Sequence, residues 1–132
     1  MQQARLWAVA MVLTMAAPAA AETSVRFTNA EGIAIEARLL LPAGQGPFPA
    51  IIALHGCGGR DNARGALTHR HRDWADRWVG QGHAVLLPDS FGSRGLGPQC
   101  SVADRSVRPG RERASDVAAA RVFLQGRADI RA

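Results

Sequence analysis

Lysine is absent from this chain of 132 residues, and all 16 basic side chains are arginines. The arginines raise the sequence pI to about 11.2, although the formal net charge is only +5. Acidic residues stand between them, at Asp73, Asp76, Asp104, Glu112 and Asp116. Nucleic-acid-binding proteins usually cluster basic residues with few acids between them, so we expect no nucleic-acid partner. The hydrophobic fraction of 47% excludes wholesale disorder.

The chain also lacks an apolar run long enough for a comfortable transmembrane helix. Its apolar run, Leu6 to Ala16, follows the basic Arg5 and precedes the small residues Ala19 to Ala21. This order is typical of a secretory signal peptide, here residues 1–21, cleaved before Glu22. An uncleaved anchor is the alternative, and no cysteine follows the run to carry a lipid. We therefore expect one domain, residues 22–132, in the periplasm or outside the cell, without stable membrane insertion.

Cysteine is scarce, with only Cys57 and Cys100. In an oxidising compartment an even pair makes a disulfide plausible. Two free cysteines, or a Cys57 buried beside a functional site, remain open alternatives. A bridge requires the two Cα atoms to lie within about 7 Å.

The first half of the chain contains strand patterns. Residues 24–28 and 33–41 alternate apolar and polar side chains around a turn, which predicts an antiparallel hairpin. Residues 50–54 form a continuous apolar run, as expected of a strand buried on both faces. The hairpin and this strand are joined by a loop rich in glycine and proline.

The second half alternates helix and strand patterns. Apolar and aromatic residues recur at helical spacing from Leu67 to Trp78, residues 83–87 resemble a second buried strand, and a long loop covers residues 88–110. A second helix is predicted over residues 111–125, with one side formed by Ala114, Val117, Ala118, Arg121 and Leu124. Residues 129–132 resemble the approach to a further strand. The whole predicts an α/β fold with a largely parallel sheet and flanking helices.

The junction at the end of the 50–54 run is the strongest functional signal. The run breaks into the glycine loop, residues 55–59, with the sequence His-Gly-Cys-Gly-Gly. Backbone N–H groups in such a loop can stabilise the oxyanion of an acyl-transfer intermediate, and Gly56 and Cys57 are our candidates. The alternative is a tight turn that needs glycine for steric reasons only. Cys57 does not fit a nucleophile elbow, because His55 stands where the first glycine is required.

A Gly-x-Ser-x-Gly elbow is also absent from the 132 residues. The sequence is therefore interpreted as the front part of a hydrolase, without the attacking residue. Taken alone, such a chain is expected to be inactive. Its missing strand would leave an unpaired apolar edge that promotes aggregation.

Three segments resemble the dienelactone hydrolase family of α/β-hydrolases: residues 51–59, residues 74–78 with Gly82, and residues 85–95. The resemblance implies an incomplete α/β-hydrolase fold that acts on an ester or lactone by nucleophilic acyl transfer, without a cofactor or metal. The serine or cysteine nucleophile, the acid and the histidine would follow Ala132. Dienelactone hydrolase itself carries glutamate where this chain has His55, a difference that favours the exported, esterase-like relatives.

The resemblance also singles out polar residues near the expected substrate site. Arg94 matches in type an arginine that the family uses near its substrate, and His55 is the second candidate substrate contact. Alternatively, His55 orients its loop by hydrogen bonding, and Arg94 stabilises a loop by pairing with Asp89 or with carbonyl groups. Asp89 is expected to be structural. The arginines at 105, 108, 111 and 113 are expected to be a solvated loop and helix start.

Two further functions are compatible with the sequence. His69, His71 and Asp73 match the His-x-His-x-Asp run of dinuclear zinc hydrolases, but on a helix His69 and His71 would point about 200° apart. A metal-dependent hydrolase is therefore one alternative. A noncatalytic binding module that keeps part of the fold is the other.

Overall fold

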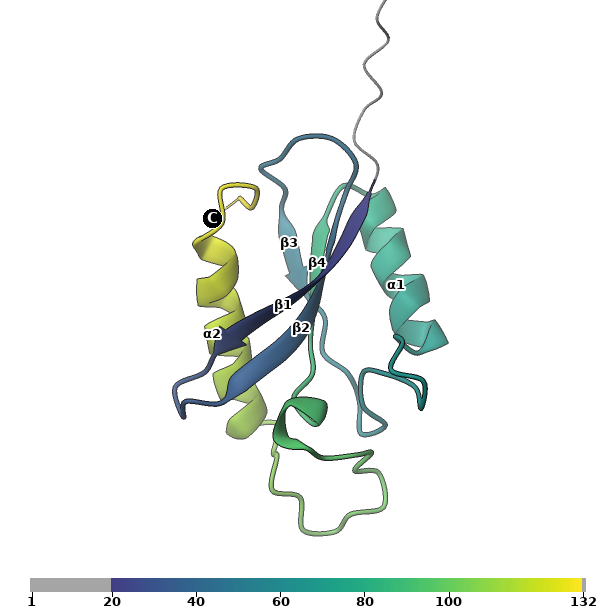
Figure 1. Cartoon of the computed structure of the whole chain (residues 1–132), viewed down its shortest axis with the longest axis vertical. Coiled ribbons are helices and arrows are strands. Elements are labelled where there is room, and N and C mark those ends of the chain that lie inside the picture. The colour runs from purple at the N-terminus through teal and green to yellow at the C-terminus, as the bar shows by residue number, and fades with distance from the viewer. Residues whose placement is uncertain (1–19, 132) are drawn as a thin grey trace, which may run out of the picture.

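The computed structural model describes residues 20–131, so most of the predicted signal peptide lies outside the described residues. The described elements are β1 (Ala21–Thr28), β2 (Ala34–Leu41), β3 (Ala50–Ile52), α1 (His69–Gly80), β4 (Ala84–Pro88), the short helix η1 (Gly92–Arg94) and α2 (Glu112–Gln125). The four strands form one sheet in the order β1-β2-β4-β3, and α1 and α2 lie on opposite sides of it (Figure 1). Within residues 20–131, no helix has the length and apolar character needed to cross a membrane.

The predicted hairpin is confirmed. Strands β1 and β2 pair antiparallel, with Ala21 opposite Leu41 and Thr28 opposite Ala34. The turn between them is stabilised by the Asn29 side chain, whose Oδ1 accepts hydrogen bonds from the N–H groups of Glu31 and Ile33 at 3.1 and 2.8 Å. Such side-chain bonds to the following backbone are the reason asparagine favours turns.

Strand β4 is the buried centre of the sheet. Ala84 and Leu86 belong to the apolar core beneath α2, whereas Val85 and Leu87 belong to the core beneath α1. Because both faces are covered, the strand carries apolar side chains at every position. The prediction of a largely parallel sheet is wrong for the described residues: β4 pairs antiparallel with β2, and only β3 pairs with it in parallel.

Strand β3 lies at the edge of the described sheet. Its predicted parallel pairing with β4 is confirmed, since Ala50, Ile51 and Ile52 face Ala84, Val85 and Leu86. The expected burial on both faces is not found: its residues are half-buried, and Leu54 is 46% exposed. Among residues 20–131 no full strand pairs with its other edge.

The chain returns to this free edge after α2. Phe48 donates its N–H to the carbonyl of Asp129 at 2.9 Å and accepts from the N–H of Arg131 at 2.8 Å, which makes a single parallel bridge between Phe48 and Ile130. The predicted approach to a further strand is thus present as one parallel bridge, in the short segment that follows α2 (Figure 1).

Both helices form where the sequence predicts them, but the side chains that they bury differ from those predicted. In α1 the buried residue is Ala75, while Trp74 is 52% exposed. In α2 the buried residues are Asp116, Ala120 and Leu124, at i, i+4 and i+8, and not the predicted side. The second difference centres on Asp116, which is not on the predicted side but is fully buried in an ion pair with Arg94; of the predicted side, only Leu124 is buried.

Candidate functional site

The glycine loop lies at the carboxyl ends of β3 and β4, where the two parallel strands end side by side. This is the edge at which ligands bind in open α/β sheets. Within it, the N–H of Gly59 donates to the carbonyl of Gly56 at 3.2 Å, and Gly59 has a φ of 87°. The turn therefore does require glycine at one position, as the steric interpretation supposed.

His55 orients the loop from within the protein. Its side chain is buried, with a residue exposure of 3%, and Nε2 accepts a hydrogen bond from the N–H of Ser90 at 3.1 Å. Because Nε2 accepts, Nδ1 carries the proton and donates to the carbonyl of Gly56 at 2.8 Å. Burial lowers the pKa of His55, which favours this neutral form.

Three consecutive carbonyl groups of the loop are engaged by the protein. The carbonyl of His55 accepts from Arg113, that of Gly56 accepts from His55 Nδ1 as described, and that of Cys57 accepts from the N–H of Gln99 at 2.7 Å. In a planar trans peptide the N–H points opposite to the C=O. Each of these contacts therefore directs the next N–H away from its partner.

The next three N–H groups are those of Gly56, Cys57 and Gly58. Within residues 20–131, none of the three donates to a protein acceptor. Gly56 and Gly58 are exposed and Cys57 is half-buried, so the groups can be reached from outside. Successive backbone N–H groups held in this way form a concavity suited to an anion, including an oxyanion.

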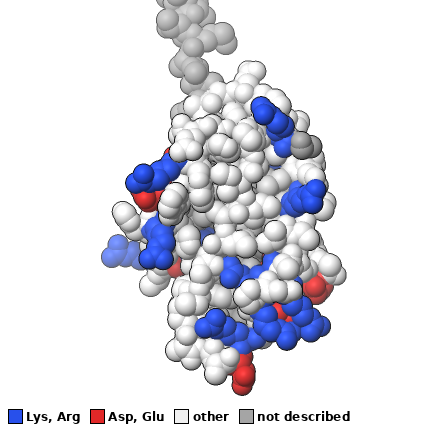
Figure 2. Space-filling model, turned by 180° about the vertical axis from the view of Figure 1, so that it is seen from behind, with Lys and Arg blue, Asp and Glu red and all other residues white. Residues whose placement is uncertain are grey.

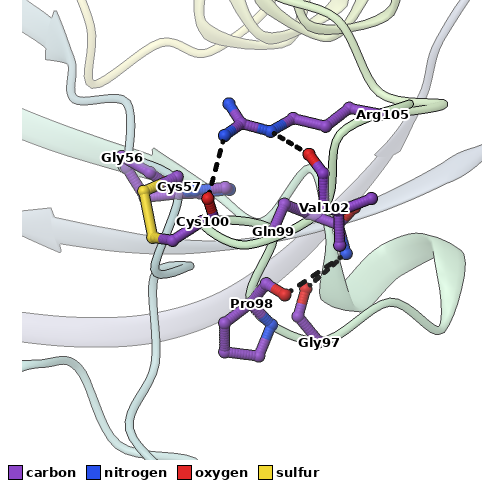
Figure 3. The surroundings of a disulfide bond; sticks show 9 residues. Gly56, Cys57, Gly97, Pro98, Gln99, Cys100, Val102 and Arg105 are labelled. Atoms are coloured by element: carbon purple, nitrogen blue, oxygen red, sulfur yellow. Dashed lines mark hydrogen bonds between the residues drawn. A yellow bond between two sulfur atoms is a disulfide. The ribbon is translucent and has the colours of Figure 1, made fainter.

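Cys57 and Cys100 form a disulfide, with their Cα atoms 4.8 Å apart. Of the alternatives left open by the sequence, the structure thus contains the bridged one. The bond joins the glycine loop to the long loop after β4 (Figure 3). The loop that holds the free N–H groups is therefore held covalently at Cys57.

Arg94 is engaged by a buried carboxylate. Its Nη1 and Nη2 donate to the two oxygens of Asp116 at 2.8 Å each, and Nη1 also donates to the carbonyl of Ser90 at 2.8 Å. Burial acts to raise the pKa of Asp116, but hydrogen bonds from Arg94, Ser90 and Asn29 outweigh it and lower that pKa. These contacts occupy the end-on bidentate face of Arg94, so in this structure it stabilises a loop through Asp116 and the Ser90 carbonyl, and not through Asp89.

Asp89 and Arg60 are structural as well. The Asp89 carboxylate accepts from the N–H groups of Phe91 and Gly92 at 3.2 and 2.8 Å and so begins η1. A Cβ at Gly92 would overlap that carboxylate, which explains the glycine there. Arg60 is buried and donates to Asp61, to the carbonyl of Glu36 near the start of β2 and to the carbonyl of Leu87 near the end of β4.

The arginines near the start of α2 are not all solvated, which corrects the expectation for Arg113. Arg113 is half-buried, lies 5.8 Å from the Phe91 ring centre and donates to the carbonyl of His55. Burial lowers the pKa of its guanidinium. Arg108 pairs with Glu112 on the surface and lowers the pKa of that carboxyl to about 2. Figure 2 shows basic side chains on one face of the molecule, several of them beside acidic ones.

The structure does not bring His69, His71 and Asp73 together. His71 Nδ1 lies 2.8 Å from the Thr68 hydroxyl and 3.0 Å from the Arg60 carbonyl, whereas Asp73 accepts from Arg77. Among the described residues there is no group of three or more His, Cys, Asp or Glu that could hold a metal. The metal-dependent alternative therefore has no support in the structure.

A hollow of about 890 Å³ adjoins the glycine loop. Its lining includes residues 56–59 of the glycine loop, Leu54, and Trp74 and Trp78 of α1. Apolar walls beside backbone donors are typical of sites for small organic ligands.

Several residues that shape the site could not be found from sequence. Arg113 and Asp116 lie 58 and 22 residues from the partners they engage, His55 and Arg94, so no local spacing connects them. Gln99 acts through its backbone, which carries no residue-type signal.

No known family model and no curated protein matches the sequence. The fold is similar to those of three solved structures. The first is brefeldin A esterase, a bacterial homologue of human hormone-sensitive lipase, with a TM-score of 0.56 and 19% identity over 89% of this chain and 30% of that chain. The second is an acetyl xylan esterase from Paenibacillus sp. R4, with a TM-score of 0.58 and 19% identity over 85% of this chain and 38% of that chain. The third is the α/β hydrolase GrgF from Penicillium sp. sh18, with a TM-score of 0.54 and 21% identity over 80% of this chain and 32% of that chain.

These similarities define the class of fold. The chain has an α/β fold that is similar to part of the fold of these hydrolase structures. It spans between 30% and 38% of the length of these three neighbours. At these identities the similarity establishes the fold alone.

Proposed function

We propose that this chain supplies the oxyanion site of an exported ester or lactone hydrolase related to the dienelactone hydrolases. The observation that carries the proposal is the set of three consecutive N–H groups, those of Gly56, Cys57 and Gly58, that donate to no acceptor within residues 20–131. They lie at the carboxyl end of β3, and the carbonyls before them are held by the protein.

The proposed chemistry is acyl transfer through a serine or cysteine outside these 132 residues. The nucleophile gives its proton to a histidine base, also outside these 132 residues, which later returns it to the leaving alcohol. The nucleophile attacks the carbonyl carbon, and the carbonyl π electrons move onto oxygen to form an oxyanion. The N–H groups of Gly56 and Cys57 donate to this oxyanion. Collapse of the intermediate expels the alcohol, which takes up a proton, and water then releases the acid from the acyl-enzyme. The Trp74 and Trp78 side of the hollow offers an apolar wall for the substrate.

The experiment compares the full natural gene product with residues 22–132 alone. We expect the gene product to hydrolyse p-nitrophenyl esters or small lactones, and residues 22–132 to be inactive because they contain no nucleophile elbow. A gene product that is folded but hydrolyses no member of either panel would contradict the proposal. A cooperatively folded, soluble fragment together with an inactive gene product would instead support the binding-module alternative.

The proposed location is the periplasm or the extracellular space. Beyond the signal-peptide pattern, the support is the Cys57–Cys100 disulfide, because disulfides persist in oxidising compartments. Recovery of the mature protein from the periplasmic or culture fraction, beginning near Glu22, is the expected result.

A further inference from the structure

We propose that the disulfide between Cys57 and Cys100 positions the oxyanion-binding N–H groups, so that its reduction lowers the rate of catalysis without unfolding the protein. This inference rests on the proposed function, because it assigns the residues that position the same site. It identifies Cys100, 43 residues further along the chain, as a positioning residue for the reaction.

The first step of the argument concerns the place of Cys57 in the loop. Two of the three free N–H groups belong to the peptide units on either side of the Cys57 Cα atom, namely those of Cys57 and Gly58. Rotation at this Cα changes the direction of both. The disulfide leaves from the Cβ of the same residue and ties it to the second loop (Figure 3). The disulfide therefore restrains the Cys57 Cα, the atom that lies between the peptide units of both N–H donors.

A second contact joins the same two segments. The N–H of Gln99 donates to the carbonyl of Cys57 at 2.7 Å, which directs the N–H of Gly58 away from Gln99. The disulfide and this hydrogen bond come from adjacent residues, Cys100 and Gln99, and engage one residue of the glycine loop. Together they hold both the position of Cys57 and the direction of the following peptide plane.

The segment that supplies these contacts is ordered by its own hydrogen bonds. We call it the clamp segment, residues 97–105. The Gln99 side chain donates to the carbonyl of Gly97 at 2.9 Å, and Arg105 donates to the carbonyls of Cys100 and Val102 at 3.3 and 3.2 Å. Figure 3 shows the Arg105 guanidinium reaching across the clamp segment to both carbonyls. The clamp segment thus acts as a compact unit to which the glycine loop is attached.

The glycine loop has few other restraints at this point. Gly56 and Gly58 have no side chains, and an added Cβ at either position would meet no atom within 4 Å. His55 orients the Gly56–Cys57 peptide, but the contacts described for the Cys57–Gly58 peptide come from the clamp segment alone. Without the bridge, one hydrogen bond would remain to keep the clamp segment against Cys57.

The test uses the full natural gene product and a variant pair. Cys100→Ser removes the bridge but leaves every residue of the glycine loop in place. Ser101→Ala, a neighbouring exposed residue, is the matched control. Loss of one oxyanion donor costs about 10²–10³ in rate, so a donor that is only less well oriented should cost less, about tenfold in kcat. KM should not change, because the donor acts in the transition state.

Treatment with reductant distinguishes a disulfide that positions the N–H donors from one that only stabilises the fold. Dithiothreitol should lower the kcat of the wild type to the level of Cys100→Ser and should leave the Cys57→Ala/Cys100→Ala variant unchanged. Amide hydrogen exchange should become faster in residues 56–59, while β4 stays protected. An unchanged kcat in Cys100→Ser, with ester hydrolysis intact, would overturn the inference and leave the proposed function standing.

The role of the bridge can also be tested if the proposed function fails. If the gene product hydrolyses no ester or lactone, the proposed function fails, and hydrogen exchange alone decides the role of the bridge. Faster exchange confined to residues 56–59 after reduction would support positioning by Cys100. Exchange that is unaltered, or that rises equally in β4, would contradict it.

Discussion

His55 shows how one residue at the end of a strand sets the geometry of the loop that follows. Its neutral ring bridges two backbone segments by accepting from Ser90 and donating to Gly56. A protonated ring has no free lone pair at Nε2, so the first of these bonds requires the neutral form. The fold is therefore coupled to the protonation state of the His55 ring.

The coupling predicts how stability depends on pH. Because burial lowers the pKa of His55 below its ordinary value of 6.5, the unfolded chain binds more protons than the folded one in the acidic range. The free energy of unfolding should be at its full value above pH 6.5 and should fall as the pH drops below it. Urea denaturation between about pH 5 and about pH 8, at intervals of about one pH unit, would measure this. His55→Gln should lose this part of the pH dependence; an equally steep fall in that variant would contradict the assignment.

The contribution of the ion pair between Arg94 and Asp116 to stability can be tested by a single substitution. Removing one partner of a buried pair leaves the other charge uncompensated, which costs roughly 3–5 kcal/mol. Since Arg94 is partly exposed, we expect Asp116→Ala to lower the free energy of unfolding by about 3 kcal/mol, the lower end of that range. Arg121→Ala, an exposed position on the same helix, should change it by less than about 0.5 kcal/mol. Equal effects at the two positions would refute the structural role of Asp116.

At the scale of elements, the free edge of β3 is the feature with the clearest consequence. Phe48, just before β3, already bonds to residues 129 and 131, so the chain after α2 starts to run parallel to this edge. The rest of the edge, with exposed Leu54 beside it, is unpaired within the described residues. Unpaired apolar edges pair with other chains.

This edge predicts self-association of residues 22–132 when they are produced alone. Leu54→Lys should reduce the association seen by light scattering, because a charge at an edge opposes strand pairing. Val122→Lys is the matched control: Val122 is 69% exposed, but it lies on α2. A control variant that reduces association as strongly as Leu54→Lys would point to general hydrophobicity and not to the edge.

The elements also show what the sequence could predict. The hairpin and β4 follow from local patterns: alternating side chains in one case, a continuous apolar run in the other. The sequence predicted an unpaired apolar edge, but not that β3 would form it, since an apolar run does not say on which side its neighbour lies. The prediction of the buried side of α2 was wrong, because a buried aspartate cannot be told from a surface aspartate until its partner, Arg94, is known.

The same limit applies to the site. The glycine loop was recognisable because its residues are consecutive, and the two cysteines allowed a bridge. The groups that orient the loop come from Arg113, Gln99 and Ser90, which only the folded chain brings near His55 and Cys57. For Arg94 the sequence left two roles open, because its residue type was visible but its partner Asp116, 22 residues away, was not.

For the molecule as a whole, the disulfide is the main covalent restraint within the described residues. It closes a loop of 43 residues, which the chain-entropy account converts to about 4 kcal/mol of stability. Reduction should lower the free energy of unfolding by that order, measured by urea denaturation with and without reductant. The double variant Cys57→Ala/Cys100→Ala should not respond to reductant. A wild type that is equally insensitive would show that the bridge contributes nothing to the folded state.

The most direct test of the account is a crystal structure of the full natural gene product after reaction with an organophosphate such as diethyl p-nitrophenyl phosphate. The phosphoryl oxygen then stands where the oxyanion would form. We expect it about 2.7–3.1 Å from at least one backbone nitrogen among Gly56, Cys57 and Gly58. A phosphoryl oxygen bound by other donors, with these three N–H groups facing only solvent, would contradict the central claim.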